Sequence, residues 1–171
     1  PRSVSRFGND TQYHDESAEA LATLVLTLRG TPFLYEGQEI GMTNFDFPDM
    51  QKVRDVESIN IWNIGKRLHL PRSLRWRMIK TKSRDNARTP MQWNDSPNAG
   101  FTTGTPWLSV NGNYPRINVA EQENAPNSVL AYYRQLIAFR NGSEILQAGD
   151  FSELYRKDGV YAYRRSLNVE S

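Results

Sequence analysis

The fold class is decided by residues 15–35, DESAEALATLVLTLRGTPFLY. The helical spacing i, i+3, i+4, i+7 is kept by five apolar residues, namely Ala18, Leu21, Ala22, Val25 and Leu28. Asp15 is expected to cap this helix, Glu16 favours its positive end, and Gly30 is expected to end it. The apolar run 31–35 predicts a buried strand. Helix, short loop and buried strand are typical of a parallel α/β sheet or barrel.

The following segment, residues 36–125, breaks this rhythm with frequent Gly, Pro, Asn and Asp. A loop of this length inside a compact domain is usually functional. It is predicted to contain one helix, at residues 70–81. The basic residues of that helix are Arg72, Arg75, Arg77 and Lys80. They are compatible with a phosphate partner, but such a run favours a solvated helix face.

A second amphipathic helix is predicted at residues 127–141, capped by Asn127 or Ser128 and ended by Gly142. A composition shift near residues 142–150 marks a candidate domain boundary.

Two strands are predicted beyond that boundary, at residues 151–155 and 160–165. Between them lies Asp158-Gly159, and Asp-Gly is a strong signal for a two-residue hairpin turn.

Composition excludes several classes of function. The 171 residues contain no cysteine, which excludes disulfides, Cys-based zinc sites and a Cys nucleophile. His14 and His69 are far apart and form no ligand pattern, and no stretch approaches the length of a membrane span. The net charge of +2 does not by itself indicate a nucleic-acid partner. Because the chain opens at Pro1 without Met or a signal peptide, we expect a piece of a longer, cytoplasmic protein, although secretion stays open.

The chemistry is concentrated in residues 83–93, SRDNARTPMQW, followed by residues 98–104, NAGFTTG. This is an Arg/Asp cluster with an aromatic wall, set between a Pro turn and a Gly-rich loop. A sugar site needs charged forks that grip hydroxyl groups and a flat apolar face for the ring. A buried structural ion pair beside a core Trp would give the same pattern.

This signature resembles that of exo-acting α-glucosidases in the α-amylase superfamily, glycoside hydrolase family 13, above all the oligo-1,6-glucosidase type. Residues 1–10, PRSVSRFGND, resemble the stretch after the family's Asn-His-Asp motif, and residues 30–42 resemble the eighth barrel strand and its loop. The resemblance implies that residues 1–145 form the C-terminal part of a (β/α)8 barrel. The long segment 36–125 would be its enlarged eighth loop. Residues 146–171 would begin a C-terminal β-sandwich.

The resemblance also implies roles for single residues. Arg84 matches an arginine that reaches the bound sugar, and Arg2 is expected at the substrate site, holding its carboxylates. A second-shell or structural role is expected for four further residues, namely Glu39, Asp85, Arg88 and Trp93.

Catalysis in this family needs a nucleophile Asp and an acid/base Glu, which the resemblance places upstream of residue 1. The chain by itself is therefore expected to be inactive, with an oligosaccharide substrate and the rest of its own barrel as partners. No redox cofactor is implied, and the ligands of a possible structural calcium ion would lie upstream.

Other interpretations remain open. Trehalose-6-phosphate hydrolases and sucrose isomerases are enzymatic relatives, while amino-acid transporter heavy chains are non-catalytic homologues with a similar barrel. A basic nucleic-acid module ranks last, because no aromatic–basic interleaving of a binding motif is present.

Overall fold

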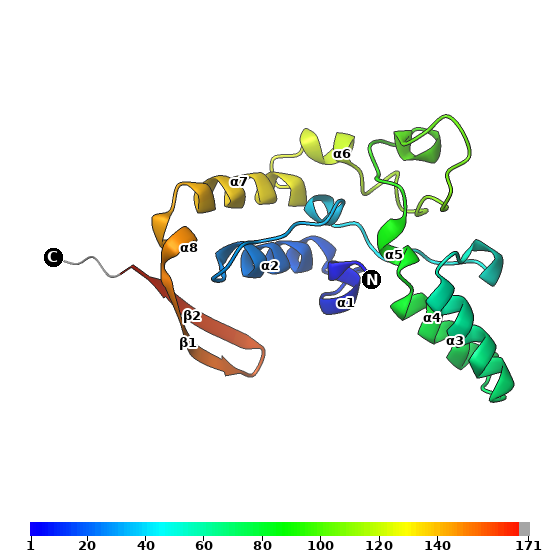
Figure 1. The fold of residues 1–171 in the computed structure, drawn as a ribbon. Helices are drawn as coiled ribbons and strands as arrows, with labels where there is room; N and C mark the ends of the chain where they lie inside the picture. Colours follow the sequence, from blue (N-terminus) through cyan, green and yellow to red (C-terminus); the bar gives the residue numbers. More distant parts are fainter. Residues whose placement is uncertain (168–171) are drawn as a thin grey trace.

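A computed structural model describes residues 1–167 of the chain. Helices α2 and α7 lie side by side at its centre, the α3–α4 hairpin projects at one end, and a β-hairpin lies at the other (Figure 1). The elements are, in order, α1 (Ser3–Phe7), α2 (His14–Thr27), η1 (Gln38–Ile40), η2 (Met50–Lys52), α3 (Val56–Arg67), α4 (Arg72–Lys82), α5 (Asp85–Arg88), η3 (Pro97–Gly100), α6 (Val119–Glu123), α7 (Val129–Asn141), α8 (Glu144–Ala148), β1 (Asp150–Lys157) and β2 (Val160–Ser166).

The central core is formed by one face of α2 against α7. Every fourth residue of α2 is buried, namely His14, Ala18, Ala22 and Leu26. Val129 and Tyr133 of α7 pack against this row, together with Val4 of α1. The predicted stripe was partly wrong, because Leu21, Val25 and Leu28 are only half-buried. The small residues Ala18 and Ala22 let the two helices approach closely, so the buried face is centred on them.

The ends of α2 differ from the prediction. Tyr13 occupies the N-terminal cap position, so Asp15 lies within the first turn, where it contacts His14. The helix ends at Thr27, before Gly30. Arg140 of α7 donates hydrogen bonds to the carbonyl oxygens of Leu26 at 2.6 Å and Gly30 at 2.7 Å. The end of α2 is therefore stabilised by the side chain of Arg140, which is distant in sequence and satisfies the carbonyl groups there.

The predicted buried strand at residues 31–35 is extended but unpaired among residues 1–167. Phe33 is 86% exposed, and Leu34 and Tyr35 are also exposed. The prediction of burial was wrong for the described chain, because the sheet within it contains only β1 and β2. A parallel strand is buried only when strands flank it and helices cover both faces of its sheet.

The long segment 36–125 contains a helical hairpin. The predicted helix at 70–81 is confirmed as α4, but α3 was missed. Trp62 of α3 meets Trp76 of α4 edge-to-face, with ring centroids 5.7 Å apart. A Cβ at Gly65 of α3 would lie 2.9 Å from Arg75 of α4, so this glycine is required by the close approach of the helices.

The C-terminal elements follow the sequence closely. Ser128, rather than Asn127, caps α7 by accepting from the Ala131 N–H at 3.2 Å, and Gly142 ends the helix as predicted. Strands β1 and β2 pair antiparallel, with Lys157 opposite Val160. Both turn residues have positive φ, 55° at Asp158 and 77° at Gly159, as a type I′ turn requires. The assignment of this hairpin to a β-sandwich from residue 146 stays a prediction.

Candidate substrate-binding site

Arg2 connects the beginning of the chain to the signature segment 83–93. Its side chain is buried, and all three guanidinium nitrogens are used. Nε donates to the carbonyl oxygen of Asn86 at 3.2 Å, one Nη donates to the Thr89 hydroxyl at 3.3 Å, and the other donates to the carbonyl oxygen of Glu36. Burial lowers the pKa of Arg2, although Tyr35 and Glu36 act against this. The planar fork thus joins three segments at one point.

Asp85 is the buried centre of the signature. It is fully buried, and its Oδ2 accepts hydrogen bonds from the backbone N–H groups of Arg54 at 2.6 Å and Asp55 at 2.9 Å. Its Oδ1 lies 3.2 Å from an Arg88 nitrogen as an ion pair, without hydrogen-bond geometry. The carboxylate therefore fixes the course of the chain at residues 54–55, which agrees with a structural role.

Asp55 is a second buried carboxylate that the sequence prediction did not include. Its Oδ2 accepts from the Ser58 hydroxyl at 2.7 Å and from the Arg84 N–H at 3.2 Å, and its Oδ1 lies 3.5 Å from Arg88. Burial alone would raise the pKa of Asp55, but these hydrogen bonds and the positive charges of Arg88 and Arg84 together lower it. The carboxyl group is therefore held as an anion.

Arg84 presents its side chain on the surface. Its backbone is held by Asp55, yet its side chain is 71% exposed and pairs with the exposed Glu57 at 2.9 Å. Such an exposed pair contributes little stability and separates easily. The structure does not join the guanidinium of Arg84 to that of Arg2, which is buried under Asn86. The positions of Arg84 and Arg2 in the structure do not test the prediction that the two residues lie at the substrate site.

Trp93 and the loop that follows form an exposed rim. Trp93 is 49% exposed, and its backbone N–H donates to the carbonyl oxygen of Ala99 at 2.9 Å. Asn98 and Ala99 adopt left-handed backbone conformations with φ of 57° and 58°. The side-chain amide of Asn98 donates to the carbonyl oxygens of Thr102 and Gly104. The aromatic face is thus available to a ligand, and Trp93 is not a core residue of the described chain.

Glu39 lies in η1 and is half-buried. Its negative charge favours the protonated form of Arg2 and adds to the burial that raises the pKa of Tyr133. Glu39 therefore influences Arg2 and Tyr133 through its charge, which agrees with a supporting role.

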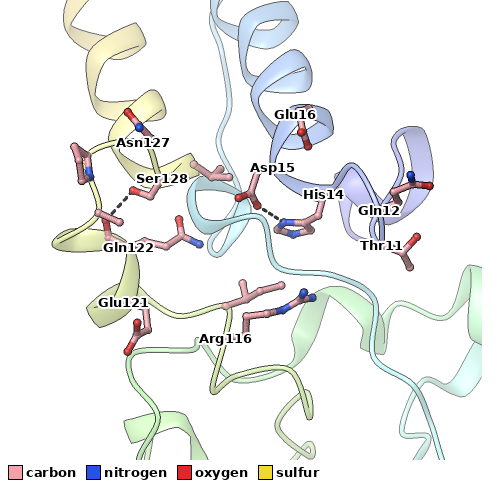
Figure 2. A pocket seen from close by; sticks show the side chains of 14 residues that line it. Thr11, Gln12, His14, Asp15, Glu16, Arg116, Glu121, Gln122, Asn127 and Ser128 are labelled. Carbon is pink, nitrogen blue, oxygen red and sulfur yellow. Dashed lines mark hydrogen bonds and ion pairs between the residues drawn. The ribbon is translucent and has the colours of Figure 1, made fainter.

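A cavity of about 630 Å³ is lined by none of the six predicted site residues. Figure 2 shows the side chains that line it. It is formed between the beginning of α2 and the segment 116–129. His14 is fixed there, with Nδ1 2.6 Å from Asp15 and Nε2 2.6 Å from the carbonyl oxygen of Gly41. Both ring nitrogens are occupied, which favours a structural role for this histidine.

Residues 1–167 contain no group of three or more His, Asp or Glu side chains that is placed to hold a metal ion. No helix of the described chain combines the length and the apolar character of a membrane span.

The sequence alone would not have identified Asp55, Ser58, Asn86 and Thr89 as partners of the predicted residues. Asp55 lies 29 residues before Arg84, and Asn86 lies 84 residues after Arg2, so only the fold brings them together. One sequence signal could have pointed to Asp55. It lies three residues before Ser58, and this spacing of polar residues is typical of the beginning of a helix, here α3.

Comparison with known proteins agrees with this architecture. The family described as "Alpha amylase, catalytic domain" matches residues 1–149. An oligo-1,6-glucosidase of Halalkalibacterium halodurans is 44% identical over all of this chain, which spans 31% of that relative. A trehalose-6-phosphate hydrolase of Bacillus licheniformis superposes with a TM-score of 0.93 at 45% identity, with 98% of this chain and 30% of that one covered. An isomaltulose synthase of Erwinia rhapontici, crystallised with sucrose, gives a TM-score of 0.92 at 46% identity over 98% of this chain and 30% of its own.

These matches extend over the signature, the segment at residues 1–10 and the extended segment at 31–35 alike. The solved relatives are barrel enzymes of the same family, so the extended segment and the helices around it correspond to part of such a barrel. The chain belongs to the α-amylase family of glycoside hydrolases, and it spans about a third of the relatives that it matches.

Proposed function

We propose that the intact protein is a retaining, exo-acting α-glucosidase of oligo-1,6-glucosidase type, which releases glucose from short α-glucosides. The observation that carries this proposal is the arrangement of the signature. Buried Asp55 accepts from the Arg84 N–H and buried Asp85 holds the backbone of residues 54–55, while Arg84 and Trp93 remain exposed. An exposed guanidinium fork and an exposed aromatic face are the groups with which a sugar hydroxyl and a sugar ring interact.

The reaction follows from the chemistry of retaining glycosidases. A nucleophilic carboxylate attacks the anomeric carbon, while the acid residue protonates the departing oxygen and the glycosidic bond breaks. The residue that acted as the acid then acts as a base and deprotonates a water molecule. This water attacks the covalent glucosyl-enzyme and releases glucose with its original configuration at the anomeric carbon. Both carboxylates would lie outside this chain, since none of its own corresponds to them. We therefore propose that residues 1–171 alone have no activity.

Related activities are the alternatives. A trehalose-6-phosphate hydrolase and an isomaltulose synthase are about as similar to the chain as the oligo-1,6-glucosidase. A synthase would pass the glucosyl group to a sugar hydroxyl instead of water. A non-catalytic homologue of the transporter heavy-chain kind would have lost the two carboxylates.

The test is NMR of the first anomer that the intact protein forms from isomaltose, with maltose, sucrose and trehalose 6-phosphate as comparison substrates. The expected product is α-glucose, formed fastest from isomaltose. Initial β-glucose would contradict retention. Isomerised disaccharide from sucrose would favour the synthase, and no cleavage of any α-glucoside would favour the non-catalytic homologue.

A further inference from the structure

A second cavity, of about 420 Å³, lies within the long segment 36–125. It is formed by the end of η2, by Asn98 and by residues 105–114. The lining side chains that could bind a ligand are those of Lys52, Arg54, Asn98, Trp107, Ser109 and Tyr114.

The cavity carries an excess of positive charge. Two of its lining residues, Lys52 and Arg54, are cationic, and none is acidic. Within residues 1–167 neither cation has a carboxylate at ion-pair distance, whereas Arg84 and Arg88 are both paired. The positive potential of two unneutralised cations at one concave site favours an anionic ligand. The cavity beside His14 differs, because Asp15, Glu16 and Glu121 line it.

An aromatic surface accompanies the two cations. Trp107 is 67% exposed and lines the cavity together with the half-buried Tyr114. An exposed tryptophan offers a large flat face whose burial against a ligand ring is favourable. Two cations beside such a face match a ligand that combines an anionic group with a ring, since each part then has its own partner.

The walls of the cavity are held in place by side-chain amides. Asn111 is buried and donates to the carbonyl oxygens of Thr43 at 3.2 Å and Asn44 at 3.1 Å, which fixes the segment that carries Trp107. Asn98, which also lines the cavity, has a left-handed backbone conformation, and its side-chain amide donates to the carbonyl oxygens of residues 102 and 104. Left-handed conformations of residues other than glycine are costly and often accompany functional sites.

Arg54 is also fixed through its backbone. Its N–H donates to Oδ2 of the fully buried Asp85 at 2.6 Å, so its Cα position is set by the signature segment. Because the donor is the backbone N–H, any residue other than proline at position 54 can retain this hydrogen bond. The charge can therefore be removed without disturbing the anchor.

We propose that this cavity binds a sugar phosphate, with the phosphate between Lys52 and Arg54 and the sugar ring against Trp107. A phosphate group accepts several hydrogen bonds at once, and the guanidinium fork matches its geometry. The proposal does not depend on hydrolysis, since it concerns binding at a place distinct from Arg84 and Trp93.

The experiment is isothermal titration of the intact protein with glucose 6-phosphate, glucose and inorganic phosphate. Glucose 6-phosphate is expected to bind at least about tenfold more tightly than either of the others, a difference of roughly 1.4 kcal/mol. Lys52→Gln and Arg54→Gln should each weaken its binding about tenfold. Trp107→Ala should weaken binding of glucose 6-phosphate but not of inorganic phosphate. Lys66→Gln in α3 is the matched control and should change nothing.

Thermal melting of each variant shows whether the fold is retained. Equal affinities for glucose 6-phosphate and glucose would overturn the proposal, as would glucose 6-phosphate affinity that is unchanged in folded Lys52→Gln and Arg54→Gln. If inorganic phosphate bound as tightly as glucose 6-phosphate and Trp107→Ala had no effect, the cavity would be a simple anion site and the sugar assignment would be wrong.

Discussion

The buried guanidinium of Arg2 donates to the backbone carbonyl of Asn86 at 3.2 Å, across 84 residues of sequence. This hydrogen bond joins residues 1–10 to the signature segment 83–93. Two of the three segments that carry the resemblance are thus held together by the buried side chain of Arg2.

Replacing Arg2 by Met should therefore destabilise the intact protein. The buried carbonyl oxygen of Asn86 and the partly buried carbonyl oxygen of Glu36 would lose their donor, which costs about 2–4 kcal/mol in the free energy of unfolding. Urea denaturation measures this, and Arg6→Met, at an exposed arginine that lies over Phe7, should change stability by less than about 0.5 kcal/mol. Equal stability of the two variants would contradict the supporting role of Arg2.

Local patterns predicted much of the fold. The helix at 127–141 and the hairpin at Asp158-Gly159 were predictable because caps, period and turn residues all act within a few positions. The helix α3 was not, since its Val, Ile, Asn and Gly residues have low helix propensity. Its stability comes from packing between Trp62 and Trp76, which depends on α4 and cannot be read from the helix alone.

The candidate site was predictable to a similar degree. The signature itself pointed to Arg84, Asp85, Arg88 and Trp93. The role of Asp55 could not be predicted, because it depends on the chain folding back so that its carboxylate meets the Arg84 N–H. The solvent exposure of these residues could not be predicted from the sequence either, since only the fold distinguishes the buried Asp85 from the exposed Trp93.

Asp55 should make the stability of the intact protein depend on acid pH. Its pKa is lower in the folded state than in the unfolded state, so the unfolded state binds the proton more readily. Its contribution is fully present above the unfolded pKa, near about 4, and is lost as pH falls through the folded value. Urea denaturation between pH 2 and 7 should therefore show a decline at low pH that is reduced in Asp55→Asn. An identical decline in both proteins would contradict the assignment.

Gly41 is required by the position of His14. It has φ of 69°, and a Cβ there would lie 2.7 Å from His14 Cε1, an atom of a buried ring held on both sides. Gly41→Ala should destabilise the intact protein by about 2–4 kcal/mol, through backbone strain and displacement of the ring. Gly112→Ala is the control, since nothing lies within 4 Å of its added Cβ. If thermal denaturation gave the same loss of stability for Gly41→Ala and Gly112→Ala, this explanation would be excluded.

Arg84 should affect catalysis of the intact protein without affecting its fold. Its side chain is 71% exposed and contacts only the exposed Glu57 among the described carboxylates, so truncation removes little stability. If the guanidinium grips a sugar hydroxyl in the transition state, Arg84→Ala should reduce kcat/KM on isomaltose by about 10²-fold, or roughly 2.7 kcal/mol. Arg84→Lys should restore little of this, because an ammonium group lacks the fork.

The ion pair with Glu57 supplies the matched control for that prediction. Glu57→Gln leaves Arg84 in place but removes its partner at 2.9 Å, so it should alter kcat/KM far less than Arg84→Ala. A loss of activity shared equally by both variants would mean that the pair itself is what matters, as a structural contact. Wild-type kinetics in a folded Arg84→Ala protein would remove Arg84 from the substrate site, and the exposed face of Trp93 would remain as the candidate contact on this rim.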